Sequence, residues 1–152
     1  MIDSIDIVMF IRQGFVREGI GFGMSIKELK EKIGDPDSVI GDTIRGYLMY
    51  DCLRFGYLDD IVDEIAILFC VDDNFRLKIN LENVDDEITV IAGTTKINEF
   101  IKLLSINGIN WQSQYRKNEL DYVSIHVENK SAATFELQTG FLTRIALYPP
   151  AE

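Results

Sequence analysis

The chain has 152 residues, 47% of them hydrophobic, and its 25 acidic and 15 basic side chains give a formal net charge of −10. That length suffices for one compact domain, and the negative charge argues against nucleic acid or anionic lipid as a partner. The sequence has no run of about 18 apolar residues, which excludes a membrane-spanning helix. Asp3 and Asp6 stand where a secretory signal would carry Lys or Arg. We therefore expect a cytoplasmic protein.

Two helices are predicted in the first quarter of the chain. Apolar residues at helical spacing indicate a short amphipathic helix over residues 3–13. A second helix is predicted over residues 25–33, because Ser25 and Glu28 form a capping box at its start. Gly34 suits the left-handed position that ends a helix.

Strand-like runs follow, separated by Asp-rich turns at Asp59-Asp60 and Asp72-Asp73. The predicted strands are residues 47–50, 52–57, 64–71 and 75–80. Alternation places on an inner face the apolar residues Leu53, Phe55, Tyr57, Ile65, Ile67, Phe69, Phe75, Leu77 and Ile79. The outer face then carries a mixture that water or a partner could cover, namely Cys52, Arg54, Ala66, Leu68, Cys70, Arg76, Lys78 and Asn80.

The second half repeats this order of elements. An acidic linker at 85–87 and a possible edge strand at 88–91 precede a helix predicted over residues 95–106. Strands are predicted over residues 121–127, 132–138 and 141–148. Their inner face comprises Val123, Ile125, Val127, Ala133, Phe135, Leu137, Ile145 and Leu147, and their outer face Tyr122, Ser124, His126, Thr134, Glu136, Gln138, Arg144 and Tyr148.

The two halves share one spacing, since the helix starts at Ser25 and Thr95 and the strand starts at Asp51 and Asp121 are each 70 residues apart. We therefore predict an α+β fold of two tandem helix-plus-antiparallel-sheet repeats, with the helices packed on one face of a curved sheet. The whole chain, residues 1–152, is expected to form a single compact domain, made of repeats over about 1–84 and 85–152.

The residues that could carry chemistry form only weak patterns. Cys52 and His126 occupy outer-face positions in equivalent strands, so a nucleophilic pair is conceivable, although no third orienting residue accompanies it. Cys52 and Cys70 could approach each other on neighbouring strands, but buried thiols are the expected state in a reducing cytoplasm. The acid pairs could hold a cation, yet turn chemistry explains most of them. We expect no catalytic activity, no metal and no cofactor.

A protein-binding surface is the better-supported prediction. The first half is the more acidic one, with 16 acidic and 9 basic residues in 1–84 against 9 and 6 in 85–152, so a basic protein partner is expected. Trp and Tyr supply contact area at low entropic cost. The predicted partner-binding residues are Asp59, Asp60, Asp63, Asp72, Asp73, Tyr122, His126, Glu136, Tyr148 and Trp111.

The segment from Gly23 to Leu29, closed by Gly34-Asp35-Pro36, resembles a conserved stretch of the small outer-membrane lipoproteins of the barrel-assembly machinery. That group is related to the β-lactamase inhibitor proteins, in which tandem helix-plus-sheet units bind a protein through a sheet face. The strand Leu53-Arg54-Phe55-Gly56 and the helix end Gly108-Ile109-Asn110-Trp111 also look like those of bacterial cytoplasmic proteins suspected to be immunity partners of secreted toxins.

The resemblance implies a non-catalytic immunity protein that neutralises a cognate bacterial toxin, such as a basic nuclease, by covering it. Two alternatives stay open. One is an assembly or envelope-factor-like module that binds another protein, and the other is a small-molecule-binding domain with a pocket lined by His126 and the outer-face tyrosines. The sequence leaves the toxin's identity and the oligomeric state unassigned.

Overall fold

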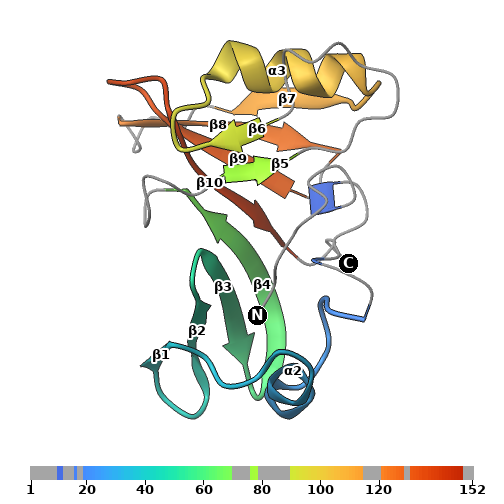
Figure 1. Ribbon diagram of the computed structural model, residues 1–152, viewed down its shortest axis with the longest axis vertical. Coiled ribbons are helices and arrows are strands. Elements are labelled where there is room, and N and C mark those ends of the chain that lie inside the picture. The colour runs from blue at the N-terminus through green and yellow to red at the C-terminus, as the bar shows by residue number, and fades with distance from the viewer. Residues whose placement is uncertain are drawn as a thin grey trace.

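The computed structural model of the chain describes residues 10–11, 16, 19–69, 76–78, 90–114, 121–128 and 131–148. Within them the elements, labelled in Figure 1, are α2 (Ile26–Ile33), β1 (Ser38–Gly41), β2 (Arg45–Tyr50), β3 (Leu53–Leu58), β4 (Ile61–Leu68), β5 (Arg76–Lys78), β6 (Val90–Ala92), α3 (Ile97–Ile106), β7 (Trp111–Gln114), β8 (Tyr122–Val127), β9 (Ser131–Glu136) and β10 (Leu142–Leu147).

Eight strands form one antiparallel sheet in the order β1-β2-β3-β4-β10-β9-β8-β7, while β5 and β6 form a separate pair. Strands that follow each other along the chain are neighbours in the large sheet except at its centre, where β4 pairs with β10 (Figure 1). In that central pair Ile145 lies opposite Ile67, and Leu147 lies opposite Ile65. The only edges of the sheet are therefore β1 and β7, within the residues described above.

The predicted fold of two tandem helix-plus-sheet repeats, with helices packed on one face, is wrong. The described chain contains two short helices, of 8 and 10 residues, against a continuous sheet of eight strands. Sequence spacing identifies similar local patterns, but it does not show which strand edges meet. The edges of β4 and β10 carry backbone N–H and C=O groups that need partners, and their pairing merges the strands into one sheet.

Most individual elements lie close to their predicted positions. The helix predicted over 25–33 is observed at Ile26–Ile33, and that over 95–106 at Ile97–Ile106. The predicted capping box is present, because the Glu28 N–H donates to Ser25 Oγ and the Ser25 N–H donates to Glu28 Oε2, both at 3.1 Å. Strands β1 and β7 were not predicted. The linker at 85–87 falls outside the described residues. Of the helix expected over 3–13 only Phe10 and Ile11 are described, and both are helical and buried.

One hydrophobic cluster occupies the inner face of the large sheet and draws side chains from both halves of the chain. The alternation predicted for the strands is confirmed at Phe55, Ile65, Phe135 and Ile145, each at most 1% exposed. The ring of Phe100 in α3 contacts that of Phe135 in β9, with centroids 5.6 Å apart. Leu137 is an exception, because it lies in the turn after β9 and is 47% exposed.

The opposite side of the sheet is called the outer face below. Its central residues are Tyr47, Met49, Arg54, Glu64, Ala66, Leu68, Arg144, Ala146, Ala132, Thr134, Ser124 and His126. Ala66, Leu68 and Ala146 form a small second hydrophobic cluster there, with Met49 packed against it. No helix in the described part of the chain has the length and apolar composition needed to cross a membrane.

Replacing Ile145 with Ala should lower the free energy of unfolding by about 2–5 kcal/mol, because a buried isoleucine at the β4–β10 junction leaves a cavity. Urea unfolding followed by circular dichroism measures this. The matched control is Ile106→Ala in α3, where the side chain is 44% exposed and the effect should stay within about 0.5 kcal/mol. Equal losses in the two variants would contradict the assignment of the junction as core.

Candidate functional site

Exposed apolar side chains gather at the end of the outer face formed by β1 to β4. Ile40 is 58%, Ile44 59%, Leu58 41% and Ile61 41% exposed. Residues opposite each other in an antiparallel pair share a face, which places Ile40 beside Tyr47 and Leu58 beside Ile61. Ile44 lies in the turn between β1 and β2, and its backbone is close to the turn between β3 and β4, because the Asp59 N–H donates to its carbonyl. We call Ile40, Ile44, Tyr47, Leu58 and Ile61 the apolar patch.

The two-residue turn between β3 and β4 places carboxylates beside this patch. Asp59 and Asp60 join Leu58 to Ile61 with φ values of 49° and 65°. A hairpin loop of two residues with positive φ matches the twist of the strands it joins, and Asp tolerates that conformation better than most residues. Asp63 follows at a bulge in β4 opposite Gly56 and Tyr57. The aspartates of this turn are therefore favoured by its backbone conformation, and they also make it negatively charged.

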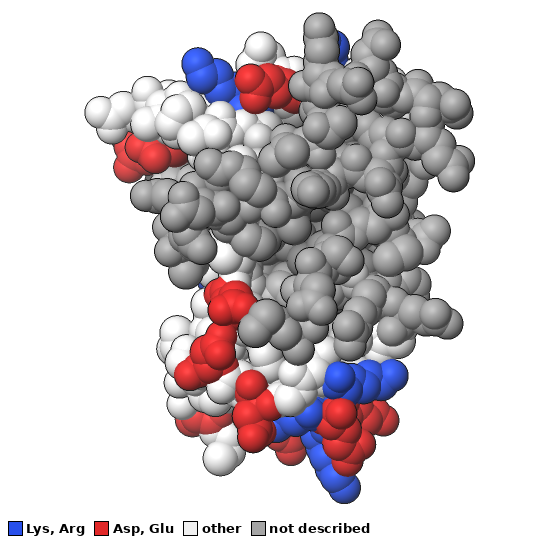
Figure 2. Space-filling model, viewed as in Figure 1, with Lys and Arg blue, Asp and Glu red and all other residues white. Residues whose placement is uncertain are grey.

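Acidic residues dominate the whole segment around the patch. Residues 34–64 contain eight acidic side chains and two arginines. Figure 2 shows acidic side chains spread over the lower half of the molecule, where β1 to β4 lie, with basic side chains interleaved near α2. The sequence of α2 contributes Lys27, Lys30 and Lys32 there. An apolar surface with this surrounding charge is complementary to a partner that carries basic groups around an apolar contact.

The turn between β1 and β2 is held by Asp42. Its Oδ1 accepts hydrogen bonds from the backbone N–H groups of Arg45, at 2.9 Å, and Ile44, at 2.8 Å. These bonds favour the charged carboxylate and lower the pKa of Asp42. The phenol of Tyr57 donates to the Asp42 carbonyl at 2.5 Å. The far end of β1 is therefore fixed in place.

The near end of β1 is held by a second aspartate and a tyrosine. Asp37 Oδ2 accepts from the Asp51 N–H at 2.7 Å, and the Asp37 N–H donates to the Met49 carbonyl at 2.8 Å. The phenol of Tyr50 donates to the carbonyl of Gly34, the C-cap of α2, at 2.9 Å. Partial burial and the charges of two nearby aspartates raise the pKa of Tyr50 to about 12.

Arg54 forms the charged centre of this half of the outer face. Its guanidinium lies 2.6 Å from Glu64 Oε1 and stacks 4.6 Å from the ring centroid of Tyr47. The side chains of Arg54 and Glu64 are 20% and 19% exposed. Because this guanidinium is already paired with a carboxylate and a ring, the exposed charges of the region are those of the acidic turns and of Arg45, which lies opposite Leu58.

The structure divides the predicted partner-binding residues between two places. Asp59, Asp60 and Asp63 lie beside the apolar patch, whereas Tyr122, His126 and Glu136 lie together on β8 and β9, where Tyr122 is opposite Glu136. Strand β10 lies between the two groups.

The remaining predicted residues are placed separately. Tyr148 follows β10 and is 42% exposed. Trp111, on edge strand β7, lies opposite the core residue Val127 and so belongs to the inner-face side. Asp72 and Asp73 fall outside the described residues. The sequence reasoning missed Ile40 and Ile44, although a β-branched pair between Asp37 and Gly41 is a strand signal that could have indicated β1.

The conceivable pair of Cys52 and His126 is not formed. Cys52 is buried in the turn between β2 and β3, and β4, β10 and β9 separate that region from His126 on β8. Cys70 falls outside the described residues, so the predicted proximity of Cys52 and Cys70 is not tested. Among the residues that the structure describes, no group of three or more His, Cys, Asp or Glu side chains is arranged to hold a metal ion.

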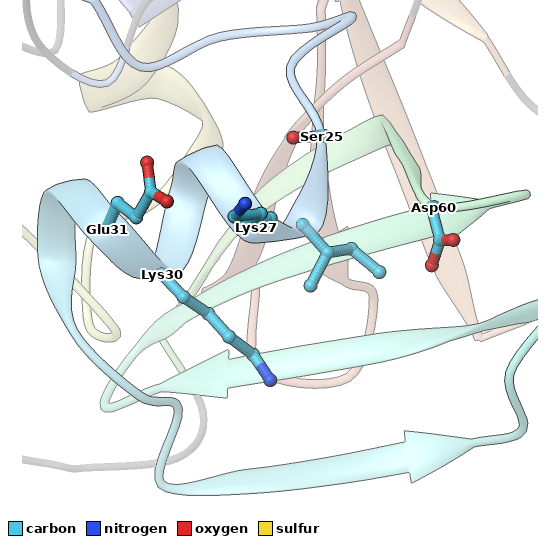
Figure 3. A pocket seen from close by; sticks show the side chains of 6 residues that line it. Ser25, Lys27, Lys30, Glu31 and Asp60 are labelled. Carbon is cyan, nitrogen blue, oxygen red and sulfur yellow. The ribbon is translucent and has the colours of Figure 1, made fainter.

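An open depression lies at the start of α2, where its first turn meets the turn after β3. Figure 3 shows the side chains around it, and its lining residues are Ser25, Ile26, Lys27, Lys30, Glu31 and Asp60. Two of the N-terminal amides of α2 are already used here, since the Glu28 N–H donates to Ser25 Oγ and the Ile26 N–H donates to the Asp60 carbonyl. The bond between Ile26 and Asp60 joins the start of α2 to the turn between β3 and β4.

No protein-family model, curated protein sequence or solved structure matches this chain.

Replacing Tyr50 with Phe should lower the free energy of unfolding at neutral pH by about 1 kcal/mol, because the bond to Gly34 is lost. The phenol of Tyr50 stabilises the fold while it is neutral, so its contribution is complete below pH 10, the unfolded pKa, and is lost as pH rises to about 12. Urea unfolding across this range should show a steeper alkaline loss in the wild type than in Tyr50→Phe.

The control is Tyr122→Phe, which alters an exposed phenol on β8. This variant should keep the wild-type stability at neutral pH. If Tyr50→Phe and the wild type lose stability in parallel above pH 10, the contact at Gly34 does not anchor this end of β1.

Proposed function

We propose that this chain is a non-catalytic protein-binding module that neutralises a cognate bacterial toxin by covering it, as an immunity protein does. The observation that supports this function is the apolar patch, where Leu58 and Ile61 are exposed opposite each other on β3 and β4, and Ile40 is exposed on the same face of β1, on the other side of β2. Isolated apolar residues are common on protein surfaces, but contiguous ones rimmed by polar groups mark interaction sites. In this proposal the chain acts stoichiometrically in the cytoplasm and needs no cofactor.

The charge around the patch favours a basic partner. The carboxylates of Asp59 and Asp60 flank Leu58 and Ile61, and the chain as a whole carries a net charge of −10. Such a field accelerates encounter with a positively charged protein, while the apolar contact slows dissociation. A nuclease toxin, whose substrate is an anion, is the class of partner that fits this charge.

The first experiment is co-expression with the product of the neighbouring reading frame. That product should arrest growth when expressed alone, and co-expression of this chain should restore growth through a one-to-one complex that can be purified. Failure of the two proteins to bind would count against the proposed function.

The apolar patch is tested by Leu58→Gln, with Leu137→Gln as its matched control. The two leucines are 41% and 47% exposed, and Leu137 lies in the turn after β9, outside the patch. Loss of apolar contact should weaken binding of the toxin by about tenfold or more for Leu58→Gln. Leu137→Gln should bind like the wild type. Equal affinities for the two variants would place the interface elsewhere.

The acidic turn is tested by the double variant Asp59→Asn and Asp60→Asn. Asn tolerates positive φ at least as well as Asp, so the turn should keep its shape while losing two charges. Stopped-flow measurements should give an association rate several-fold lower than wild type at low salt, with the difference vanishing at about 1 M salt. An unchanged rate at low salt would show that this turn does not steer the partner.

A further inference from the structure

Strand β1 is an exposed edge of the eight-stranded sheet, and it is uncharged. All residues from 37 to 45 are exposed, and β1 itself consists of Ser38, Val39, Ile40 and Gly41. Val39 is 54% exposed on one face of the strand and Ile40 58% on the other. Edge strands are commonly guarded by lysine, proline or a covering element, whereas in the described structure β1 pairs with β2 alone.

The alternation of hydrogen-bonded and non-hydrogen-bonded residue pairs between β1 and β2 determines which backbone groups of β1 point toward the unpaired side. The Asp42 N–H donates to the Arg45 carbonyl at 3.0 Å, so these two residues form a hydrogen-bonded pair. Bonded and non-bonded pairs alternate in an antiparallel ladder. Ile40 therefore bonds with Tyr47 in β2, while Val39 and Gly41 direct their N–H and C=O groups toward the unpaired side.

The strand is also fixed before anything binds it. Asp37 and Asp42 hold its two ends through the hydrogen bonds described above, to the backbone of Asp51 and to that of Ile44 and Arg45. A rigid edge loses little conformational entropy when another strand pairs with it. Ile40 belongs to both the edge and the apolar patch, so the two surfaces are continuous.

Charge decides which occupant this edge suits. Antiparallel pairing of β1 with β1 of a second copy would bring Asp37 of each chain toward Asp42 of the other, and like charges opposite each other destabilise a sheet. A strand with an apolar centre and basic ends would instead place opposite charges at both positions. The edge is therefore complementary to a basic segment and unfavourable for self-pairing.

We propose that β1 accepts an extended segment of the basic partner as a ninth strand of the sheet. Backbone hydrogen bonds would form to Val39 and Gly41, apolar side chains of the segment would contact Val39 and Ile40, and its basic ends would lie near Asp37 and Asp42. The assignment of this segment to a toxin rests on the proposed function, whereas the capacity of the edge to take a basic strand does not.

The wild-type chain is tested with a synthetic octapeptide of alternating threonine and valine with a lysine at each end, and with its glutamate-ended counterpart. Amide hydrogen exchange followed by NMR should show exchange at Val39 and Gly41 slowed about tenfold or more by the lysine-ended peptide, and little changed by the other. Protection at Ser113 on edge strand β7, equal effects of the two peptides, or no protection would overturn the proposal. Protection of Val39 in the chain alone, with dimer formation, would identify a second copy as the occupant and overturn it too.

The toxin complex is tested with Val39→Pro, which removes an outward N–H at an edge where proline is tolerated. Its matched control is Ser113→Pro on edge strand β7. The Glu128 N–H donates to the Asn110 carbonyl, so by the same alternation the N–H of Ser113 also points toward the unpaired side of its strand. Val39→Pro should weaken toxin binding about tenfold or more and Ser113→Pro should not. If both variants bind like the wild type, the edge proposal fails and the immunity function stands. If no toxin binds while the lysine-ended peptide protects Val39, the function fails and the edge proposal stands.

Discussion

The pairing of β4 with β10 is the constraint on which the rest of the molecule depends. It joins Ile67 to Ile145, residues that are 78 positions apart in the chain, in the middle of the large sheet. Because each strand of the pair would otherwise present an unpaired edge, this ladder satisfies backbone groups that neither half could satisfy alone. It also places side chains from both halves in one hydrophobic cluster.

Because β4 and β10 pair at the centre of the sheet, only its two outermost strands have unpaired edges among the described residues. Strand β1 ends one side and β7 the other, and the acidic turns lie near the β1 side. The apolar patch, the carboxylates of Asp59 and Asp60, and the outward groups of Val39 therefore belong to one end of the molecule. The proposed docking of a basic protein combines three physical terms there, namely apolar burial, electrostatic steering and backbone pairing.

The local structure was largely predictable, because caps and alternation are local properties. Ser25 and Glu28 indicated the start of α2, and Phe55, Ile65 and Phe135 indicated the inner face. The arrangement of these elements could not be predicted, because the pairing of strands that are far apart in the sequence leaves no periodic pattern in it. The sequence gives little sign of strand β1, because its two apolar residues, Val39 and Ile40, stand between turn-forming ones. Asp42 shows the same limit, since its role as a turn cap depends on the Ile44 and Arg45 amides.

Native-state hydrogen exchange of the isolated chain tests the central pairing most directly. If β4 and β10 join the two halves into one cooperative sheet, the amides of Ile67 and Ile145 should exchange only through global unfolding, with the free energy measured by denaturant. Amides at the β1 edge should exchange far sooner. Exchange at Ile67 and Ile145 through a partial opening, with the two halves of the chain still protected separately, would contradict this account.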